Sequence, residues 1–258
     1  MSIEDLFSLE GKVAVVTGAG GVLAGEIAQG FADAGAQVAV VDLNLESATE
    51  RALAICKHQK KAIPIQADVT RKADLENALH VTLENFGRVD ILLNGAGINS
   101  ATPFFEISEQ EWQRIIDVDL RSVFLGCQVF GKAMIDAGRG GSIINISSAS
   151  SGPPLSKVFT YSVAKGGVNQ ITQFLAREFA PHRVRVNALV PGFFPAEQNR
   201  KILTTERVAQ IMTHTPMARF GDASELIGAC VYLASERASS FVTGSLLRVD
   251  GGYGAMTI

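Results

Sequence analysis

Short apolar runs alternate with longer amphipathic segments along most of the chain. The runs are rich in β-branched residues and cover residues 12–17, 37–41, 62–66, 89–93, 142–146, 184–190 and 245–249. Runs of this kind are typical of strands buried on both faces of a sheet. The segments between them repeat apolar residues at intervals of three and four, and they predict helices over about 23–35, 45–60, 71–86, 108–137, 159–180 and 223–234. The alternation predicts an α/β fold, a doubly wound parallel sheet of about seven strands with helices on both faces.

No linker, low-complexity segment or second core interrupts this alternation, so we expect a single domain over residues 1–258. The least regular stretch, 195–221, follows a strand at the edge of the sheet where ligands bind, and it carries an excess of basic residues. It is predicted to be a lid over the substrate. A helix with an ordinary solvated face is the alternative. The helix over 108–137 is expected to be continuous and to begin with a capping box formed by Ser108 and Glu111.

Composition narrows the possible partners. The chain has 258 residues, a formal net charge of -3 and no basic cluster, so nucleic acid and anionic membrane surfaces are not expected as partners. The expected partner is a small molecule. Three widely separated cysteines, Cys56, Cys127 and Cys230, are expected to be buried reduced thiols and not a disulfide or metal site. With no secretory pattern at the start and no apolar stretch of spanning length, these features predict a cytoplasmic protein.

The first strand leads into a glycine turn and a helix. Thr17-Gly18-Ala19-Gly20-Gly21 would allow a close backbone approach to a pyrophosphate at the start of that helix. Asp42 ends the second strand, twenty-four residues after Gly18, where a carboxylate can accept both hydroxyl groups of an adenosine ribose. Asp42 would repel a ribose 2′-phosphate, and no arginine or lysine stands nearby to bind one. The pattern therefore predicts NAD in preference to NADP.

Two further turns follow strands at the same edge. Asp68-Val69 comes after the third strand and Asn94-Gly95-Ala96-Gly97 after the fourth. Each is placed to contact a ligand, and each is also compatible with ordinary turn chemistry.

Candidate acid/base chemistry lies around Tyr161 and Lys165. Residues four apart in a helix share one face, so an ammonium would lie beside a phenol. At about 5 Å and an effective dielectric of about 20, that charge would stabilise a phenolate by roughly 3 kcal/mol. Ser148 follows the strand over 142–146, with its hydroxyl free to bond a substrate oxygen. A core tyrosine beside a solvated lysine is the alternative for such a pair taken alone.

Together these motifs resemble the short-chain dehydrogenase/reductase family, over essentially the whole chain. The resemblance implies a Rossmann-like fold, an NAD-dependent reaction and a homotetramer. It implies that Tyr161 exchanges the proton of the substrate oxygen, that Ser148 bonds that oxygen, and that Lys165 holds the nicotinamide ribose. The coenzyme contacts that it implies are Thr17, Gly18, Gly20, Gly21, Leu23, Asp42, Asp68, Val69, Asn94, Ala96, Gly97, Tyr161, Lys165, Pro191, Gly192 and Phe194.

Three positions depart from the family pattern. Val22 and Ala24 replace later glycines of the turn, so Gly20 and Gly21 must provide the close approach. Ala196 replaces a threonine that often bonds the carboxamide. Asp119 stands where most members have an asparagine that steadies a water beside the lysine. Its carboxylate can accept a hydrogen bond from that water and would stabilise a protonated Lys165, so we expect Asp119 to act in catalysis through an altered proton relay.

Within the family, the glycine turn, residues 191–200 and residues 214–221 most resemble sugar-acid reductases of the D-mannonate (fructuronate) type. This likeness suggests a sugar acid or polyol as substrate, with Asn199 and Arg200 as substrate contacts and Arg200 or Lys201 as partner of the carboxylate. Alternatives are a 3-oxoacyl thioester, a small cyclic alcohol or a steroid as substrate. A catalytically silent nucleotide-binding protein is a further one.

Overall fold

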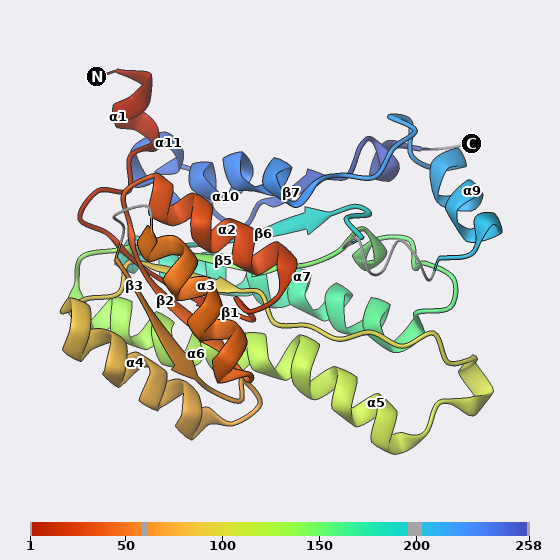
Figure 1. Cartoon of the computed structure of the whole chain (residues 1–258), viewed down its shortest axis with the longest axis horizontal. Helices are drawn as coiled ribbons and strands as arrows, with labels where there is room; N and C mark the ends of the chain where they lie inside the picture. The colour runs from red at the N-terminus through yellow and green to blue at the C-terminus, as the bar shows by residue number, and fades with distance from the viewer. Residues whose placement is uncertain (1, 58–60, 196–202, 257–258) are drawn as a thin grey trace.

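The computed structural model describes residues 2–57, 61–195 and 203–256. Its centre is one parallel sheet in the order β3-β2-β1-β4-β5-β6-β7 (Figure 1). The strands are β1 (Val13–Thr17), β2 (Gln37–Asp42), β3 (Ala62–Gln66), β4 (Ile91–Asn94), β5 (Gly141–Ile146), β6 (Val184–Pro191) and β7 (Leu246–Val249). The doubly wound parallel sheet predicted from the apolar runs is confirmed. Because every neighbouring pair is parallel, the carboxyl ends of all seven strands share one edge.

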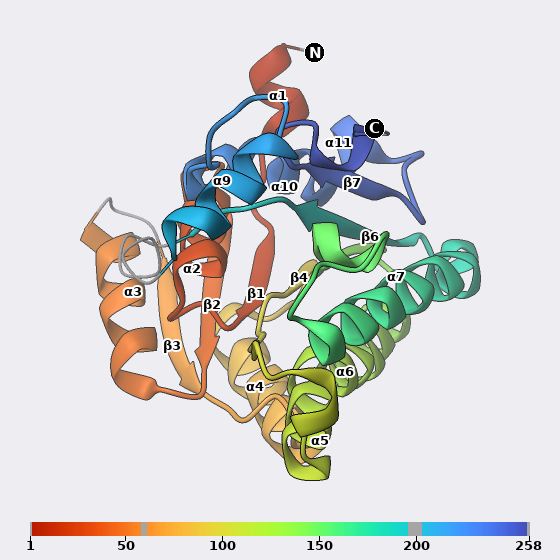
Figure 2. The same ribbon diagram turned by 90° about the vertical axis from the view of Figure 1, so that its right-hand side faces the viewer.

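Helices cover both faces of the sheet (Figure 2). On one face lie α2 (Val22–Asp33), α3 (Leu45–Lys57) and α10 (Ile227–Ala234), which bury Ile27 and Phe31. On the other lie α4 (Lys72–Phe86), α6 (Ser122–Ala137) and α7 (Phe159–Phe179), which bury Phe130 and Met134. Full burial of each such side chain contributes about 1.5–3 kcal/mol, so the two cores hold the strand ends in fixed positions.

The helix predicted over 108–137 is not continuous. α5 (Glu109–Ile116) leads into a π-helical turn over Asp117–Arg121, and α6 follows it. The N–H of Ser122 donates to the carbonyl of Asp117, five residues back, which accommodates one extra residue and rotates Asp119 into the interior. Such turns inside α-helices are frequent at functional sites.

Only one of the two hydrogen bonds of the predicted capping box forms. The Ser108 hydroxyl accepts a hydrogen bond from the Glu111 N–H at 3.1 Å. The Glu111 carboxylate, however, accepts from the Thr102 hydroxyl at 2.9 Å, and so it ties the preceding loop to the helix.

Other differences from the expectations are local. The predicted helix over 223–234 begins with a 3₁₀ turn over Ala223–Leu226. The apolar pattern does not predict helices α1 (Ile3–Phe7) and α11 (Glu236–Ser239). Helix α9 (Thr205–Thr213) lies within 195–221, the stretch for which a helix is the alternative to a lid. Cys127 and Cys230 are buried, but Cys56 is exposed on the outer side of α3, so its predicted burial is wrong. No helix within the described residues is long and apolar enough to cross a membrane.

Candidate active site

The glycine turn after β1 packs against its neighbours so tightly that side chains are excluded. Gly18 has a φ of +69°, and a Cβ there would lie 2.7 Å from the Cα of Ala96. A Cβ on Gly20 would lie 2.9 Å from the Cγ of Asp42. Gly21 caps α2 with no side-chain hydrogen bond, which leaves the first N–H groups of the helix for another acceptor. These residues fit the pyrophosphate of a dinucleotide at this position.

Asp42 lies beside that turn, at the end of β2. Its Oδ2 accepts from the N–H of Gly20 at 2.9 Å, and its Oδ1 accepts from the N–H of Asn44 at 3.0 Å. Both bonds fix the carboxylate without using all of its lone pairs, so it can still accept from ribose hydroxyls.

The turn after β4 is tied to the first turn and to the interior. The N–H of Gly95 donates to the Thr17 hydroxyl at 3.1 Å. The Asn94 amide points inward and donates to Asn145 at 2.8 Å and to the Cys127 sulfur at 3.6 Å. Burial raises the pKa of the Cys127 thiol to about 12, although its hydrogen bonds to the two amides oppose the shift. A coenzyme contact at Asn94, as predicted, would therefore use its backbone atoms.

The other predicted coenzyme residues also lie at this edge. The Asp68 carboxylate accepts from the N–H and the hydroxyl of Thr70, and Val69 is buried in the core. Leu23, in the first turn of α2, is partly buried.

The loop after β6 is wedged against β7. The N–H of Gly192 donates to the carbonyl of Val249 at 2.9 Å, and a Cβ on Gly192 would lie 2.7 Å from the Cα of Asp250. Pro191 is buried at the strand end, and the Phe194 ring fills the space where a Cβ on Gly221 would stand. The predicted nicotinamide loop thus has a fixed backbone.

Tyr161 and Lys165 lie on one face of α7, as the sequence predicts. The Lys165 ammonium is 5.4 Å from the centre of the Tyr161 ring. Lys165 is only 2% exposed, so it is not a solvated lysine. Its Nζ donates to the carbonyl of Ile146 at 3.0 Å and lies 3.2 Å from Oδ1 of Asp119. The ammonium is thus held in a buried site next to the phenol.

Asp119 reaches this site from the π-helical turn and is fully buried. Its Oδ2 accepts from the N–H of Ile98 at 3.0 Å, and Oδ1 faces Lys165. A Cβ on Gly97 would lie 2.7 Å from Oδ1, so only glycine leaves room for the carboxylate. The sequence suggests a water-mediated relay here, whereas the structure places the carboxylate in direct contact with the ammonium.

Burial raises the pKa of Asp119 above its ordinary value of 3.8, against the opposing effects of the Lys165 charge and the Ile98 N–H. A carboxyl whose pKa rises on folding contributes stability that is present below its unfolded pKa and lost as the pH rises through its folded pKa. Asp119→Asn lacks this titration. We therefore expect the unfolding free energy of the wild type, minus that of Asp119→Asn, to fall as the pH rises above about 4.

Urea unfolding curves at several pH values measure this difference. A difference that grows with pH would instead show that attraction to Lys165 outweighs the cost of burial.

Ser148 follows β5, and its hydroxyl oxygen accepts from the N–H of Ser150 at 3.2 Å and from the Ser150 hydroxyl at 3.1 Å. No described residue accepts the Ser148 proton, so that proton can be donated to a substrate oxygen. Asn169, one turn beyond Lys165 on α7, accepts from Ser147 at 2.7 Å and donates to Ser151 at 2.9 Å. It fixes the serine loop to the catalytic helix, a role that its position on the same helical face could have suggested.

The predicted substrate contacts Asn199 and Arg200 lie outside the described residues, as do Ala196 and Lys201. Nearby, the guanidinium of Arg207 on α9 donates to the Ser156 hydroxyl at 2.9 Å and to its carbonyl at 3.3 Å. Because Ser156 belongs to the loop between Ser148 and Tyr161, α9 contacts the rim of the catalytic residues.

Comparisons with known proteins agree with this geometry. The family model described as enoyl-(acyl carrier protein) reductase matches residues 18–254. The chain belongs to the short-chain dehydrogenase/reductase family. It is therefore an oxidoreductase of that family, and its fold is the one that the family shares.

Similar proteins of the short-chain dehydrogenase/reductase family include several named for sugar acids. The 5-keto-D-gluconate 5-reductase of Escherichia coli K12 is 37% identical, over 97% of this chain and 98% of its own. A gluconate 5-dehydrogenase from Burkholderia cenocepacia, in complex with NADP and tartrate, is 33% identical with a TM-score of 0.94, over 99% of this chain and 100% of its own. A candidate D-mannonate oxidoreductase from Haemophilus influenza, with bound NAD, is 35% identical with a TM-score of 0.93, over 99% of each chain.

Proposed function

We propose that this protein is an NAD-dependent oxidoreductase that interconverts a secondary alcohol and a ketone on a sugar acid or polyol. The observation that carries the reaction is the placement of Tyr161 beside the buried pair of Lys165 and Asp119, at the sheet edge that also bears the glycine turn. The names of the similar proteins support the substrate class.

Each side chain has a separate role in the proposed reaction. When bound, the coenzyme would accept a hydride at nicotinamide C4 from the carbinol carbon. Tyr161 takes the proton of the substrate hydroxyl, and Ser148 donates a hydrogen bond to the same oxygen. The Lys165 charge stabilises the phenolate, while Asp119 and the carbonyl of Ile146 hold Lys165 in place.

Asp42 supports NAD over NADP, since its carboxylate, held beside the glycine turn, would repel a ribose 2′-phosphate bound there. Arg51, the first arginine after Asp42, pairs with Glu26 at 3.1 Å and is not directed to Asp42 by any described contact. We expect Asp42→Ala to raise kcat/KM for NADP relative to NAD by about tenfold or more, which corresponds to about 1.4 kcal/mol. Steady-state kinetics with both coenzymes measure the ratio.

Asp33→Ala, which removes an exposed carboxylate at the far end of α2, is the matched control and is expected to leave the ratio unchanged. An equal ratio in Asp42→Ala and wild type would remove the basis for NAD preference.

Arg207 is proposed as a partner of the substrate carboxylate, beside the sequence-based candidate Arg200. Its described hydrogen bonds go only to neutral groups of Ser156 and Gln210, so its charge is not neutralised by a carboxylate among the described residues. A hydrogen bond to a charged group is worth about 1.5–3 kcal/mol, so Arg207→Ala should raise KM for an aldonate by about tenfold or more. KM for the uncharged polyol of the same chain length should change little.

Arg219→Ala is the matched control, because Arg219 is in the same segment but forms a 2.7 Å ion pair with Glu225. Equal changes in KM for the aldonate and the polyol would contradict the assignment of Arg207.

The description of the matching family model favours a second candidate, an acyl thioester substrate. A panel of aldonates, ketoaldonates, polyols, simple secondary alcohols and acyl thioesters, each assayed with NAD or NADH, separates the candidates. We expect turnover with the sugar acids or polyols. Activity confined to thioesters or to simple alcohols would overturn the proposed substrate class.

We also propose the homotetramer that the family resemblance implies. Phe124 on α6 is a large apolar side chain that remains 48% exposed in the single chain. Light scattering should give a particle of four chain masses, and a monomer would contradict this part of the proposal.

A further inference from the structure

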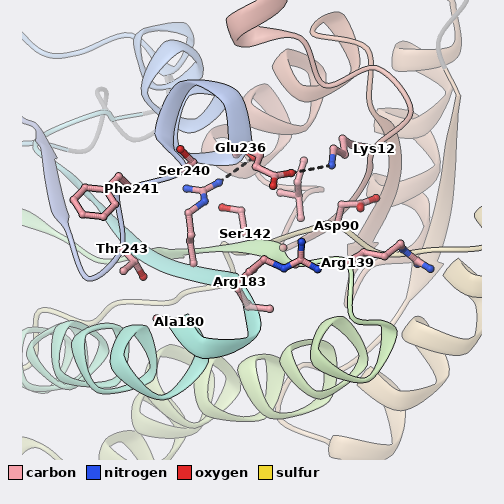
Figure 3. A pocket seen from close by; sticks show the side chains of 16 residues that line it. Lys12, Asp90, Arg139, Ser142, Ala180, Arg183, Glu236, Ser240, Phe241 and Thr243 are labelled. Atoms are coloured by element: carbon pink, nitrogen blue, oxygen red, sulfur yellow. Dashed lines mark hydrogen bonds and ion pairs between the residues drawn. The ribbon is translucent and has the colours of Figure 1, made fainter.

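A cavity of about 470 Å³ lies at the opposite end of the sheet from the catalytic residues. It is lined by the turns that lead into the amino ends of β4, β5, β6 and β7 (Figure 3). Its volume is within the range of small-molecule binding sites. None of the residues proposed to bind coenzyme or substrate belongs to its lining.

The charges of the lining are unbalanced. Two carboxylates contribute, but both are engaged: Asp90 accepts from Arg88 Nε at 2.7 Å, and Glu236 lies 3.6 Å from Lys12. Three lining arginines, Arg139, Arg183 and Arg185, form no ion pair with any described carboxylate. The cavity thus carries an excess of positive charge.

Arg185 lies in the wall and is only 7% exposed. Its guanidinium donates to the Ser239 hydroxyl at 2.8 Å, the carbonyl of Ala234 at 3.3 Å and the carbonyl of Val242 at 3.5 Å, all neutral acceptors. Its Nε donates to no described residue. The Glu236 carboxylate attracts this charge from beyond ion-pair distance, but burial still disfavours the cation. An anion in the cavity would offset that cost.

At the other end of the cavity, Arg183 is held by hydrogen bonds to the turn that leads into β5. Its Nη2 donates to the carbonyl of Gly138 at 2.7 Å, and its own carbonyl accepts from the N–H of Gly141 at 3.2 Å. A Cβ on Gly140 would lie 2.8 Å from that carbonyl oxygen. In Figure 3 the Arg183 side chain extends below Ser142, whereas Arg139 extends away from it.

We infer that this cavity binds a small organic molecule with two oxyanionic groups, phosphate or carboxylate, one facing Arg183 and the other facing Arg185. Guanidinium groups match both kinds of oxyanion through paired N–H donors. The exposed ring of Phe241 and the Thr243 side chain lie to one side of Ser142 and Arg183 (Figure 3) and can contact the organic part of the ligand. The site is separate from the catalytic edge, so coenzyme does not compete for it.

Isothermal titration of the full chain, saturated with NADH, tests the inference with three probes: citrate, fructose 1,6-bisphosphate and inorganic phosphate. The expected result is one saturable site per chain for citrate or for the bisphosphate, with weaker binding of inorganic phosphate. The probe that binds identifies carboxylate or phosphate as the source of the oxyanion. No saturable binding of any probe up to about 10 mM would overturn the proposal.

Arg183→Ala should weaken binding by about tenfold or more. Arg177→Ala, which removes an exposed guanidinium on α7, should leave the dissociation constant within about twofold. Equal dissociation constants in wild type and in a folded Arg183→Ala variant would contradict the inference.

If Arg183→Ala does not fold, a crystal structure of the wild type soaked with the probe that binds provides the test instead. Density for the probe between Arg183 and Arg185 supports the site. Density only at the glycine turn or beside Tyr161 overturns it.

Discussion

Tyr161→Phe is expected to lower kcat by about three orders of magnitude while leaving the dissociation constant of NADH unchanged. General acid/base catalysis by a positioned side chain typically contributes 10²–10⁴-fold, and phenylalanine removes the acid/base oxygen while keeping the ring. The ring packs within 5.4 Å of the Lys165 ammonium, so the site should otherwise be preserved. Steady-state turnover and titration of NADH fluorescence measure the two quantities.

Tyr253→Phe is the matched control, since its ring packs edge-to-face against Phe193 outside the Lys165 group and its hydroxyl has no role in the proposed reaction. Retained turnover in Tyr161→Phe would assign the proton transfer to another group. Loss of both turnover and NADH binding would instead point to a structural role for the hydroxyl.

Asp119→Asn is expected to reduce turnover to below a tenth of wild type, a loss of about 1.4 kcal/mol or more in the activation barrier. The carboxylate contacts two donors: Oδ2 accepts a hydrogen bond from the Ile98 N–H, and Oδ1 forms an ion pair with Lys165 at 3.2 Å. An asparagine has a single acceptor oxygen, so its NH₂ group would face either the Ile98 N–H or the ammonium. In either orientation two donors oppose each other in a buried site, and Lys165 loses a partner.

The readout that separates positioning from a general loss of structure is the pH profile of kcat, measured with the melting temperature of each variant. Asp117→Asn is the control, because Asp117 is in the same π-helical turn but pairs with Arg121 at 3.6 Å near the surface. An Asp119→Asn variant with unchanged kcat and an unchanged pH profile would show that the negative charge has no part in the relay.

The sequence predicts the sheet and most of the strand ends correctly, because buried parallel strands appear as short apolar runs and the glycine turns mark their exits. It also predicts that Tyr161 and Lys165 share a helical face, since this follows from their spacing alone. The burial of Lys165 was not predictable in the same way, because it depends on Ile146 from β5 and Asp119 from another helix.

The π-helical turn is the clearest example of a feature that the sequence does not predict. Apolar residues recur through 108–137 with helical spacing, which predicts one uninterrupted helix, and the extra residue at 117–121 leaves almost no trace in that pattern. Only the turn, however, brings Asp119 inward. Likewise the inward direction of Asn94 depends on Asn145 in the neighbouring strand, a pairing that local sequence does not encode.

The apolar pattern also does not predict the shortest helices, for a simpler reason. Helices α1 and α11 span only one turn each, too short for apolar periodicity to be visible. The exposure of Cys56 depends on which side of α3 faces the sheet, and Ala48, Ala52 and Ile55 occupy that side.

The most direct test of the central claim, that Tyr161 and Lys165 act together beside a bound dinucleotide, is a crystal structure of the protein with NADH. We expect the pyrophosphate at Gly20 and Gly21 and the hydroxyls of the nicotinamide ribose within hydrogen-bonding distance of Lys165 Nζ. Coenzyme bound elsewhere, or a nicotinamide ribose out of reach of both Lys165 and Tyr161, would contradict the account.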